Sequence, residues 1–89
     1  MNAVVSVIGA DRVGIIARLS AICAENDVNI YDITQKVRRE TFTMVMWVEF
    51  RSSEKHFADF AKEMEEVGKE MGLIIHVMHK DVFDSMHRI

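Results

Sequence analysis

The sequence carries one pattern twice, and this repeat constrains the fold more than any other feature. An extended apolar run, an amphipathic helical run and a second extended run follow one another within residues 3–39. The same order returns within residues 42–79. Two strand–helix–strand units in one short chain predict a mixed fold, in which the helices cross over a shared sheet.

The extended segments differ in how many of their faces are apolar. Residues 3–8 are apolar on both faces, which predicts a central strand. In residues 42–50, two alternating sets of side chains point to the two faces, and both sets are expected to be largely buried. We therefore expect a second central strand there. Residues 29–39 alternate polar side chains with an apolar set, which predicts an edge strand with one dry face. The apolar set is Tyr31, Ile33 and Val37.

Two helices are predicted between these strands. The first begins after Asp11, whose carboxylate can cap it, and ends near Asn26-Asp27. Its apolar stripe consists of Ile15, Leu19, Ile22 and Cys23. Ser52 or Ser53 can cap the second helix, over about 54–71, and Gly72 ends it before a last strand over 73–79.

The end of the chain predicts a further short helix that folds back onto the domain. Asp81 can cap this helix. Four apolar side chains then follow at helical spacing: Val82, Phe83, Met86 and Ile89. We expect this C-terminal helix to pack on the domain or on a partner, rather than to lie open to solvent.

Together these elements predict an α+β fold, the ferredoxin-like βαββαβ plait. Its four-stranded antiparallel sheet carries both crossover helices on one face. The other sheet face stays bare, although the central strands are apolar on both sides. We therefore expect that face to be buried by self-association, which also suits a chain too short to bury much surface alone.

Composition limits the classes of partner. The 89 residues form a single domain, 1–89, and the net charge of −3 argues against nucleic acid. Arg38-Arg39 is the sole adjacent basic pair, and an extended strand would direct the two side chains to opposite faces. One cysteine cannot form an internal disulfide and fits the reducing cytoplasm. We expect no membrane segment, because no apolar run approaches the required length of about 20 residues.

Two polar corners point to a small-ligand site. The first lies between the first strand and the first helix, within residues 9–15, where the free N–H groups of the helix can hold a carboxylate. The second lies at residues 28–32. The expected ligand-binding residues are Gly9, Asp11, Arg12, Val13, Gly14, Ile15, Asn29 and Ile30.

Structural explanations compete for several of these residues. Asp11 can serve only as a helix cap, and Asn29 can serve only to fix the turn into its strand. Arg12 can be a solvated side chain, or it can pair with a ligand carboxylate or a partner subunit. Gly14 can permit close packing of the helix on the sheet. These alternatives stay open on sequence grounds.

The sequence offers no catalytic set. The glycine spacing between Gly9 and Gly14 superficially resembles a phosphate-binding loop, but Ile15-Ile16 replaces the required Lys and Ser/Thr. His76 and His79 would point to opposite faces of a strand, so we expect no metal there. Cys23 lies on an apolar helical stripe and is expected in the core. We predict neither enzymatic activity nor a cofactor.

Two stretches of the sequence resemble the ACT domain, a small regulatory module that binds amino acids and related metabolites. They are Gly9-Ala10-Asp11-Arg12-Val13-Gly14-Ile15-Ile16-Ala17 and Val28-Asn29-Ile30-Tyr31-Asp32-Ile33-Thr34-Gln35. The ACT domains of formyltetrahydrofolate hydrolase and of the glycine-cleavage transcriptional repressor carry similar stretches. The tail, residues 82–89, is most similar to an uncharacterised family of small stand-alone ACT-domain proteins.

Three positions depart from patterns of that family. Many ACT domains carry proline at the position of Val13 and glycine at that of Asp27. Serine-sensing ACT domains carry histidine at the position of Gly9, whereas Asp11 and Asn29 match positions that contact the ligand. The resemblance implies two polar anchors for a ligand without identifying it.

The resemblance implies a non-enzymatic regulatory module that works as a homodimer. Its small-molecule effector, an amino acid or related metabolite, would lie between the 9–14 loop of one subunit and the 28–32 corner of its neighbour. The alternative is a protein-interaction module of the same fold without a ligand. A regulated protein partner is compatible with either function.

Overall fold

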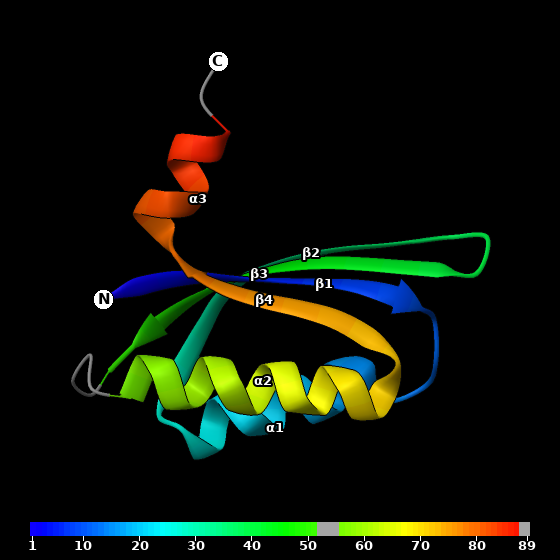
Figure 1. Ribbon diagram of the computed structural model, residues 1–89, viewed down its shortest axis with the longest axis horizontal. Coiled ribbons are helices and arrows are strands. Elements are labelled where there is room, and N and C mark those ends of the chain that lie inside the picture. Colours follow the sequence, from blue (N-terminus) through cyan, green and yellow to red (C-terminus); the bar gives the residue numbers. More distant parts are fainter. Residues whose placement is uncertain (52–55, 88–89) are drawn as a thin grey trace.

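The computed structural model describes residues 1–51 and 56–87 and has the predicted order of elements (Figure 1). These elements are β1 (Asn2–Ala10), α1 (Ile15–Glu25), β2 (Val28–Arg38), β3 (Thr41–Phe50), α2 (Phe57–Met71), β4 (Leu73–His79) and α3 (Lys80–Met86). The strands form one antiparallel sheet in the order β2-β3-β1-β4. The ferredoxin-like fold is confirmed, with β1 and β3 central and β2 at an edge.

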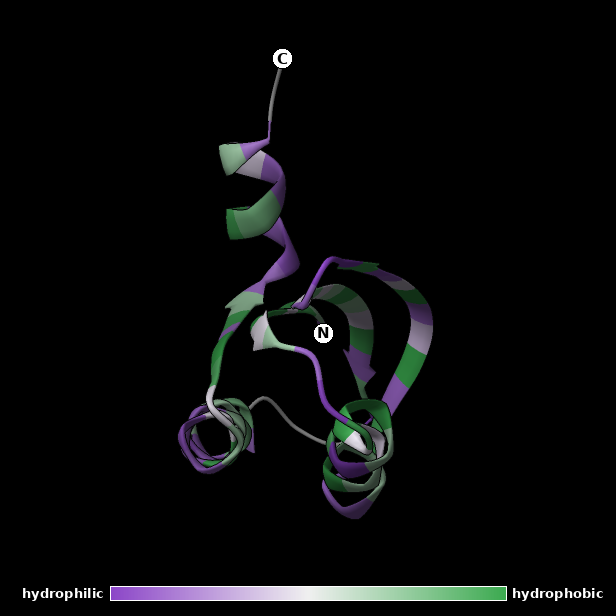
Figure 2. Cartoon of the chain, turned by 90° about the vertical axis from the view of Figure 1, so that its right-hand side faces the viewer, coloured by the Kyte–Doolittle hydropathy of each residue, from purple (hydrophilic) through white to green (hydrophobic). Residues whose placement is uncertain are grey.

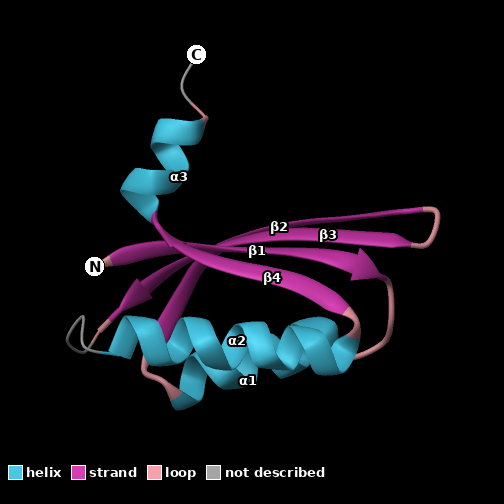
Figure 3. Cartoon of the chain, viewed as in Figure 1, coloured by secondary structure: helices cyan, strands magenta, loops and turns pink. Residues whose placement is uncertain are grey.

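The sheet separates the helices into two groups. Helices α1 and α2 cover one face, and α3 stands on the opposite side (Figures 1 and 3). The core lies between the sheet and the first two helices, as predicted. Its β1 members are Ala3, Val5 and Val7, none more than 2% exposed. All four residues of the predicted stripe on α1 are buried in the same core.

A polar contact fixes the end of α1 against α2. The Asn26 side-chain amide donates to the Ile22 carbonyl over 2.8 Å and to Glu63 Oε1 over 3.1 Å. The predicted end of the helix is confirmed, because Asp27 follows with φ 58, in the left-handed region. These bonds orient α1 and, through it, the loop that precedes the helix.

Asp11 and Asp81 were predicted to cap helices, and neither does, so these two predictions were wrong. Helix α1 begins at Ile15 with Gly14 in the cap position, and Asp11 lies three residues too early to reach the free N–H groups. Helix α3 begins at Lys80, so Asp81 lies inside its first turn rather than before it. The proposed caps Ser52 and Ser53 lie outside the described residues.

The two glycines of the first corner have different roles. Gly14 has φ 96, and a Cβ there would meet nothing within 4 Å, so the prediction that it permits close packing was wrong. Its backbone conformation, rather than space, favours glycine. Gly9 is the residue that close packing requires, because its Cβ would lie 2.7 Å from Leu73 Cδ2 and 2.8 Å from the Gly72 carbonyl oxygen.

The edge strand β2 departs from the prediction of one dry face. Ile33 and Val37 lie opposite core residues of β3, yet they are 37% and 49% exposed. Tyr31, which is 49% exposed, lies at the register shift between Ile30 and Asp32. The β2–β3 hairpin extends beyond the helices (Figure 1), so its apolar side chains stay uncovered within one chain.

The C-terminal helix forms as predicted but is only partly packed. The Phe83 ring contacts Trp47 edge-on, with ring centroids 6.0 Å apart. Val82 and Met86 remain 48% and 60% exposed. Figure 2 shows α3 set apart from α1 and α2, and Ile89 lies outside the described residues. Packing of the tail is therefore confirmed for Phe83 and not for Val82 or Met86.

Candidate functional site

The loop before α1 is an exposed corner held by one backbone bond. Asp11, Arg12, Val13 and Gly14 are all exposed, and Val13 reaches 99%. The Asp11 N–H donates to the Glu40 carbonyl over 2.9 Å, which ties the loop to the β2–β3 turn. Ile15, 2% exposed, anchors the helix start in the core. The first N–H groups of α1 have no intrahelical acceptor and face this corner.

The second corner lies where α1 gives way to β2. Asn29 is exposed and paired in register with Glu49, whereas Ile30 is half-buried against the core. A concavity of about 260 Å³ lies here, lined by Ala24, Asp27, Val28, Asn29 and Arg51. Its amide and charged groups give a polar surface next to the free edge of β2.

Within one chain the two corners lie at opposite ends of the sheet. Asn29 and Asn2 both lie opposite Glu49, whereas Ala10 lies opposite Thr41. The eight residue steps from Asn2 to Ala10 along β1 therefore separate the corners by about 26 Å, at roughly 3.3 Å per residue. The structure thus brings together Gly9 to Ile15 at one end and Asn29 with Ile30 at the other. A single chain cannot place both sets on one small ligand.

The titratable residues of the core and sheet form no catalytic arrangement among the described residues. Burial raises the pKa of the Cys23 thiol to about 11, which keeps the thiol protonated and poorly nucleophilic. His76 is exposed on one sheet face, and His79 stacks on Phe57 on the other, with ring centroids 4.3 Å apart. The predicted opposition of these two histidines is confirmed.

The described part of the chain holds neither a metal-ligand cluster nor a helix that could span a membrane. Residues 1–51 and 56–87 contain no group of three or more His, Cys, Asp or Glu that could hold a metal ion. None of the helices built from those residues is long and apolar enough to cross a membrane.

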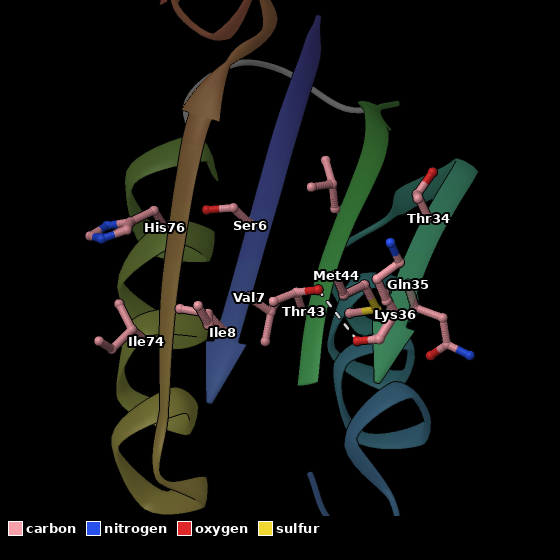
Figure 4. Close-up of a pocket in the computed structure, with 11 residues that line it drawn as sticks. Ser6, Val7, Ile8, Thr34, Gln35, Lys36, Thr43, Met44, Ile74 and His76 are labelled. Atoms are coloured by element: carbon pink, nitrogen blue, oxygen red, sulfur yellow. Dashed lines mark hydrogen bonds between the residues drawn. The ribbon is translucent and has the colours of Figure 1, made fainter. Parts of the chain in front are cut away.

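Sequence reasoning missed a groove on the sheet face opposite α1 and α2. It measures about 280 Å³ and crosses all four strands (Figure 4). A second concavity of about 500 Å³ adjoins it at the β2–β3 hairpin and is lined by Lys36, Arg38, Arg39, Thr41 and Thr43. The prediction that Arg38 and Arg39 point to opposite faces assumed that both lie on an extended strand, whereas β2 ends at Arg38 and Arg39 lies in the turn with φ 60.

The chain matches proteins of one family over nearly its whole length. The family model described as ACT domain matches residues 2–78. A UPF0237 protein of Methanocaldococcus jannaschii is 46% identical over 86 residues, which cover 97% of this chain and 96% of the relative. The solved structure of an ACT domain protein from Streptococcus pneumoniae has a TM-score of 0.81 at 34% identity, with 93% of each chain covered.

Two more distant structures share the fold alone. A putative glycine cleavage system transcriptional repressor has a TM-score of 0.79 at 20% identity, covering 89% of this chain and 45% of the other. A formyltetrahydrofolate deformylase from Pseudomonas putida has a TM-score of 0.77 at 10% identity, covering 88% of this chain and 28% of the other. The resemblance to both protein types is confirmed at the level of the fold.

Proposed function

Because the chain belongs to the ACT domain family, we propose that it binds an amino acid or related metabolite as a homodimer and transmits that binding as a regulatory signal. ACT domains are generally regulatory modules that bind small molecules. We assign the module no catalytic step. Binding across a subunit seam can change dimer stability or shape, and this coupling suffices for regulation.

The observation that carries the proposal is the placement of the two corners at opposite ends of a free edge strand. Strand β2 runs from the second corner at Val28 to Arg38, beside the loop of the first corner. Antiparallel pairing with the β2 of a second copy, centred near Ile33, would set Val28 opposite Arg38. That pairing would place the second corner of each copy beside the 9–14 loop of the other.

The surface of β2 supports pairing along this edge. The strand is 11 residues long, and every residue from 31 to 40 is exposed. Ile33 and Val37 face the helix side but remain 37% and 49% exposed within their own chain. A long edge strand with open apolar side chains is a ready template for pairing. A second copy would cover both the backbone groups and these side chains.

The chemistry of the two corners suits an amino acid. Its carboxylate would accept N–H bonds at the start of α1, where Gly14 leaves the backbone open. Its ammonium group would face the Asp11 carboxylate of the same chain or the Asn29 amide oxygen of the neighbour. Arg12 would remain available for a second carboxylate. Because Val13 and Ile30 border these groups, they would contact the side chain of the ligand. The buried Ile15 would contribute its backbone N–H at the helix start.

Thermal-shift screening against the standard amino acids tests the ligand proposal. We expect at least one to raise the melting temperature, since a ligand at 100 times its dissociation constant stabilises by about 2.7 kcal/mol. Asp11→Asn and Asn29→Ala should each abolish that rise, and Glu65→Gln on the exposed side of α2 should not. The absence of any shift would leave the chain as an interaction module of the same fold without a ligand.

Light scattering at micromolar concentration tests the dimer and its surface together. Val37→Glu should yield monomer, because it places a carboxylate in the proposed β2 seam. Ile74→Glu, on the sheet face opposite α1 and α2, should remain dimeric. If Val37→Glu stays dimeric and Ile74→Glu becomes monomeric, the dimer interface lies on that sheet face instead. The apolar pattern of the central strands, taken alone, predicts that interface.

A further inference from the structure

We propose that the open end of the sheet face opposite α1 and α2 binds a second ligand, a small organic phosphate with an apolar body. This groove is separate from the seam between the two corners. Pairing along β2 would leave the groove uncovered, so a dimer could hold both ligands. Three features of the described residues carry the proposal: an apolar floor, a cationic end and an α3 cover that stops short of the groove.

The floor of the groove is apolar and unusually open. Ile8 of β1 and Ile74 of β4 are 47% and 61% exposed, and Val45 of β3 is half-buried beside them. Figure 4 shows Ile8 and Ile74 extending from neighbouring strands on one side of the groove. These side chains provide a flat surface on which an aromatic or aliphatic body can exclude water.

The cationic end adjoins this floor directly. The groove and the hairpin concavity share Lys36 and Thr43, so they form one continuous depression. Arg38, at the end of β2, and Arg39, in the turn with φ 60, line its far part. None of these three cations forms an ion pair within residues 1–51 and 56–87. Three basic side chains against a chain charge of −3 mark a local site for an anion.

Hydroxyl groups complete the cationic end. Thr43 donates its Oγ1 hydrogen to the Lys36 carbonyl over 3.3 Å, which links β3 to β2 below the lysine side chain. Thr41 and Thr43 both line the hairpin concavity, and the Thr41 hydroxyl can donate its proton to a phosphate oxygen. Arginine and lysine with flanking hydroxyls suit a phosphate group, which accepts several charge-assisted bonds at once.

Helix α3 limits the depression at its other end. Phe83 contacts Trp47, and Val4 is 0% exposed on the same sheet face as the open Ile8. The combined space, about 280 Å³ and about 500 Å³, matches a small molecule rather than a polymer. The apolar body would therefore lie over Ile8 and Ile74, with the phosphate towards the hairpin.

Titration of 15N-labelled protein with three probes tests this site by chemical-shift mapping. The probes are 1-naphthyl phosphate, its neutral counterpart 1-naphthol, and inorganic phosphate. We expect naphthyl phosphate to bind about tenfold or more tightly than either counterpart, because each lacks one of the two contact types. The largest shifts should fall on amides of Ile8, Thr43, Val45 and Ile74, and affinity should drop as salt rises.

Matched variants decide the roles of the residues. Lys36→Gln and Arg38→Gln should each weaken the binding of naphthyl phosphate severalfold. Lys62→Gln, at an exposed position of α2, should leave this binding unchanged. Ile74→Asn should weaken naphthyl phosphate and 1-naphthol while leaving inorganic phosphate unchanged. All four positions are surface sites, so a dispersed amide spectrum would verify folding. Equal binding of inorganic phosphate, shifts confined to residues 11–16, or unchanged affinity in Lys36→Gln would overturn the proposal.

Discussion

Both faces of the sheet carry apolar side chains, but these side chains are buried to different extents. On the face towards α1 and α2, Val5 and Val7 of β1 are 0% and 2% exposed. On the other face, Val4 is equally buried, but Ile8, two positions beyond Ser6 on the same face, is 47% exposed. The difference follows from coverage by helices rather than from composition, since α3 begins beside Ala3, which pairs with His79, and Ile8 lies towards the other end of β1.

This contrast separates residues that stabilise the fold from residues available for binding. Apolar side chains under α1 and α2 contribute about 25 cal/mol for each Å² that they bury, whereas Ile8 and Ile74 contribute little until something covers them. Ile33 and Val37 on β2 are 37% and 49% exposed and would also gain from cover. The open surface of this chain is where a partner or ligand gains the most from apolar contact.

The largest expected effect is the loss of a core ring beneath the covered face. Phe60 of α2 is 0% exposed and contacts the Phe50 ring edge-on, with centroids 5.3 Å apart. Phe60→Ala should lower the free energy of unfolding by about 3–5 kcal/mol. Urea denaturation followed by circular dichroism measures this. A loss below about 1 kcal/mol would mean that the covered face is not the main core.

A smaller loss is expected where α3 covers the other face. Phe83→Ala should lower the free energy of unfolding by about 1–2 kcal/mol, because Phe83 is only half-buried. The variant should also shift Trp47 emission to longer wavelength, since the two rings are in contact. Met86→Ala, on the same helix and 60% exposed, serves as the control. Unchanged Trp47 emission in Phe83→Ala would show that α3 does not rest on the sheet in solution.

An alkaline titration of Cys23 tests the dryness of the covered face. Its pKa rises from 9.0 to about 11 by burial, so the folded thiol stays protonated where the unfolded thiol ionises. The contribution of the protonated Cys23 thiol to the free energy of unfolding is fully present below pH 9.0 and is lost as the pH rises towards about 11. At pH 10 the loss relative to pH 8 should be about 1 kcal/mol greater in the native chain than in Cys23→Ala. Equal pH dependence in both proteins would contradict a dry environment for Cys23.

The smallest effect is expected on the open part of the uncovered face. Ile74→Ala should change the free energy of unfolding by no more than about 0.5 kcal/mol, because the side chain is 61% exposed. Urea denaturation of the monomeric Val37→Glu background isolates this value from any dimer contribution. A loss of about 2 kcal/mol would show that Ile74 is buried in the folded chain, which would remove the contrast between the faces.

The sequence predicted the fold well because hydrophobic periodicity reports which sides of an element are apolar. The helix stripe ending at Cys23 and the central positions of β1 and β3 follow from that pattern alone. Periodicity cannot report whether anything covers an apolar side. Tyr31, Ile33 and Val37 alternate like a buried set, yet Tyr31 lies at a register shift, and Ile33 and Val37 remain 37% and 49% exposed.

The candidate site was predictable in its residues but not in its geometry. Asp11 and Asn29 stand out through residue type and resemblance, whereas their separation depends on strand register, which no local pattern encodes. The cap at Asp11 failed for a related reason, since the helix begins one turn later at Ile15. Lys36 and Arg38 share a face because they are two residues apart on β2, whereas Arg39 lines the same concavity from the turn, where its φ is 60. The sequence indicates a turn at this position, but it does not indicate the left-handed conformation of Arg39.

Subunit complementation tests the shared site most directly. Asp11→Asn and Asn29→Ala homodimers, each unable to bind the amino acid that stabilises the native chain, are mixed and allowed to exchange subunits. Random exchange makes half the dimers mixed, and each mixed dimer has one seam with both native side chains, so calorimetry should find about a quarter of the native sites restored. No restored binding, in a mixture shown by mass spectrometry to contain mixed dimers, would contradict a site built from two chains.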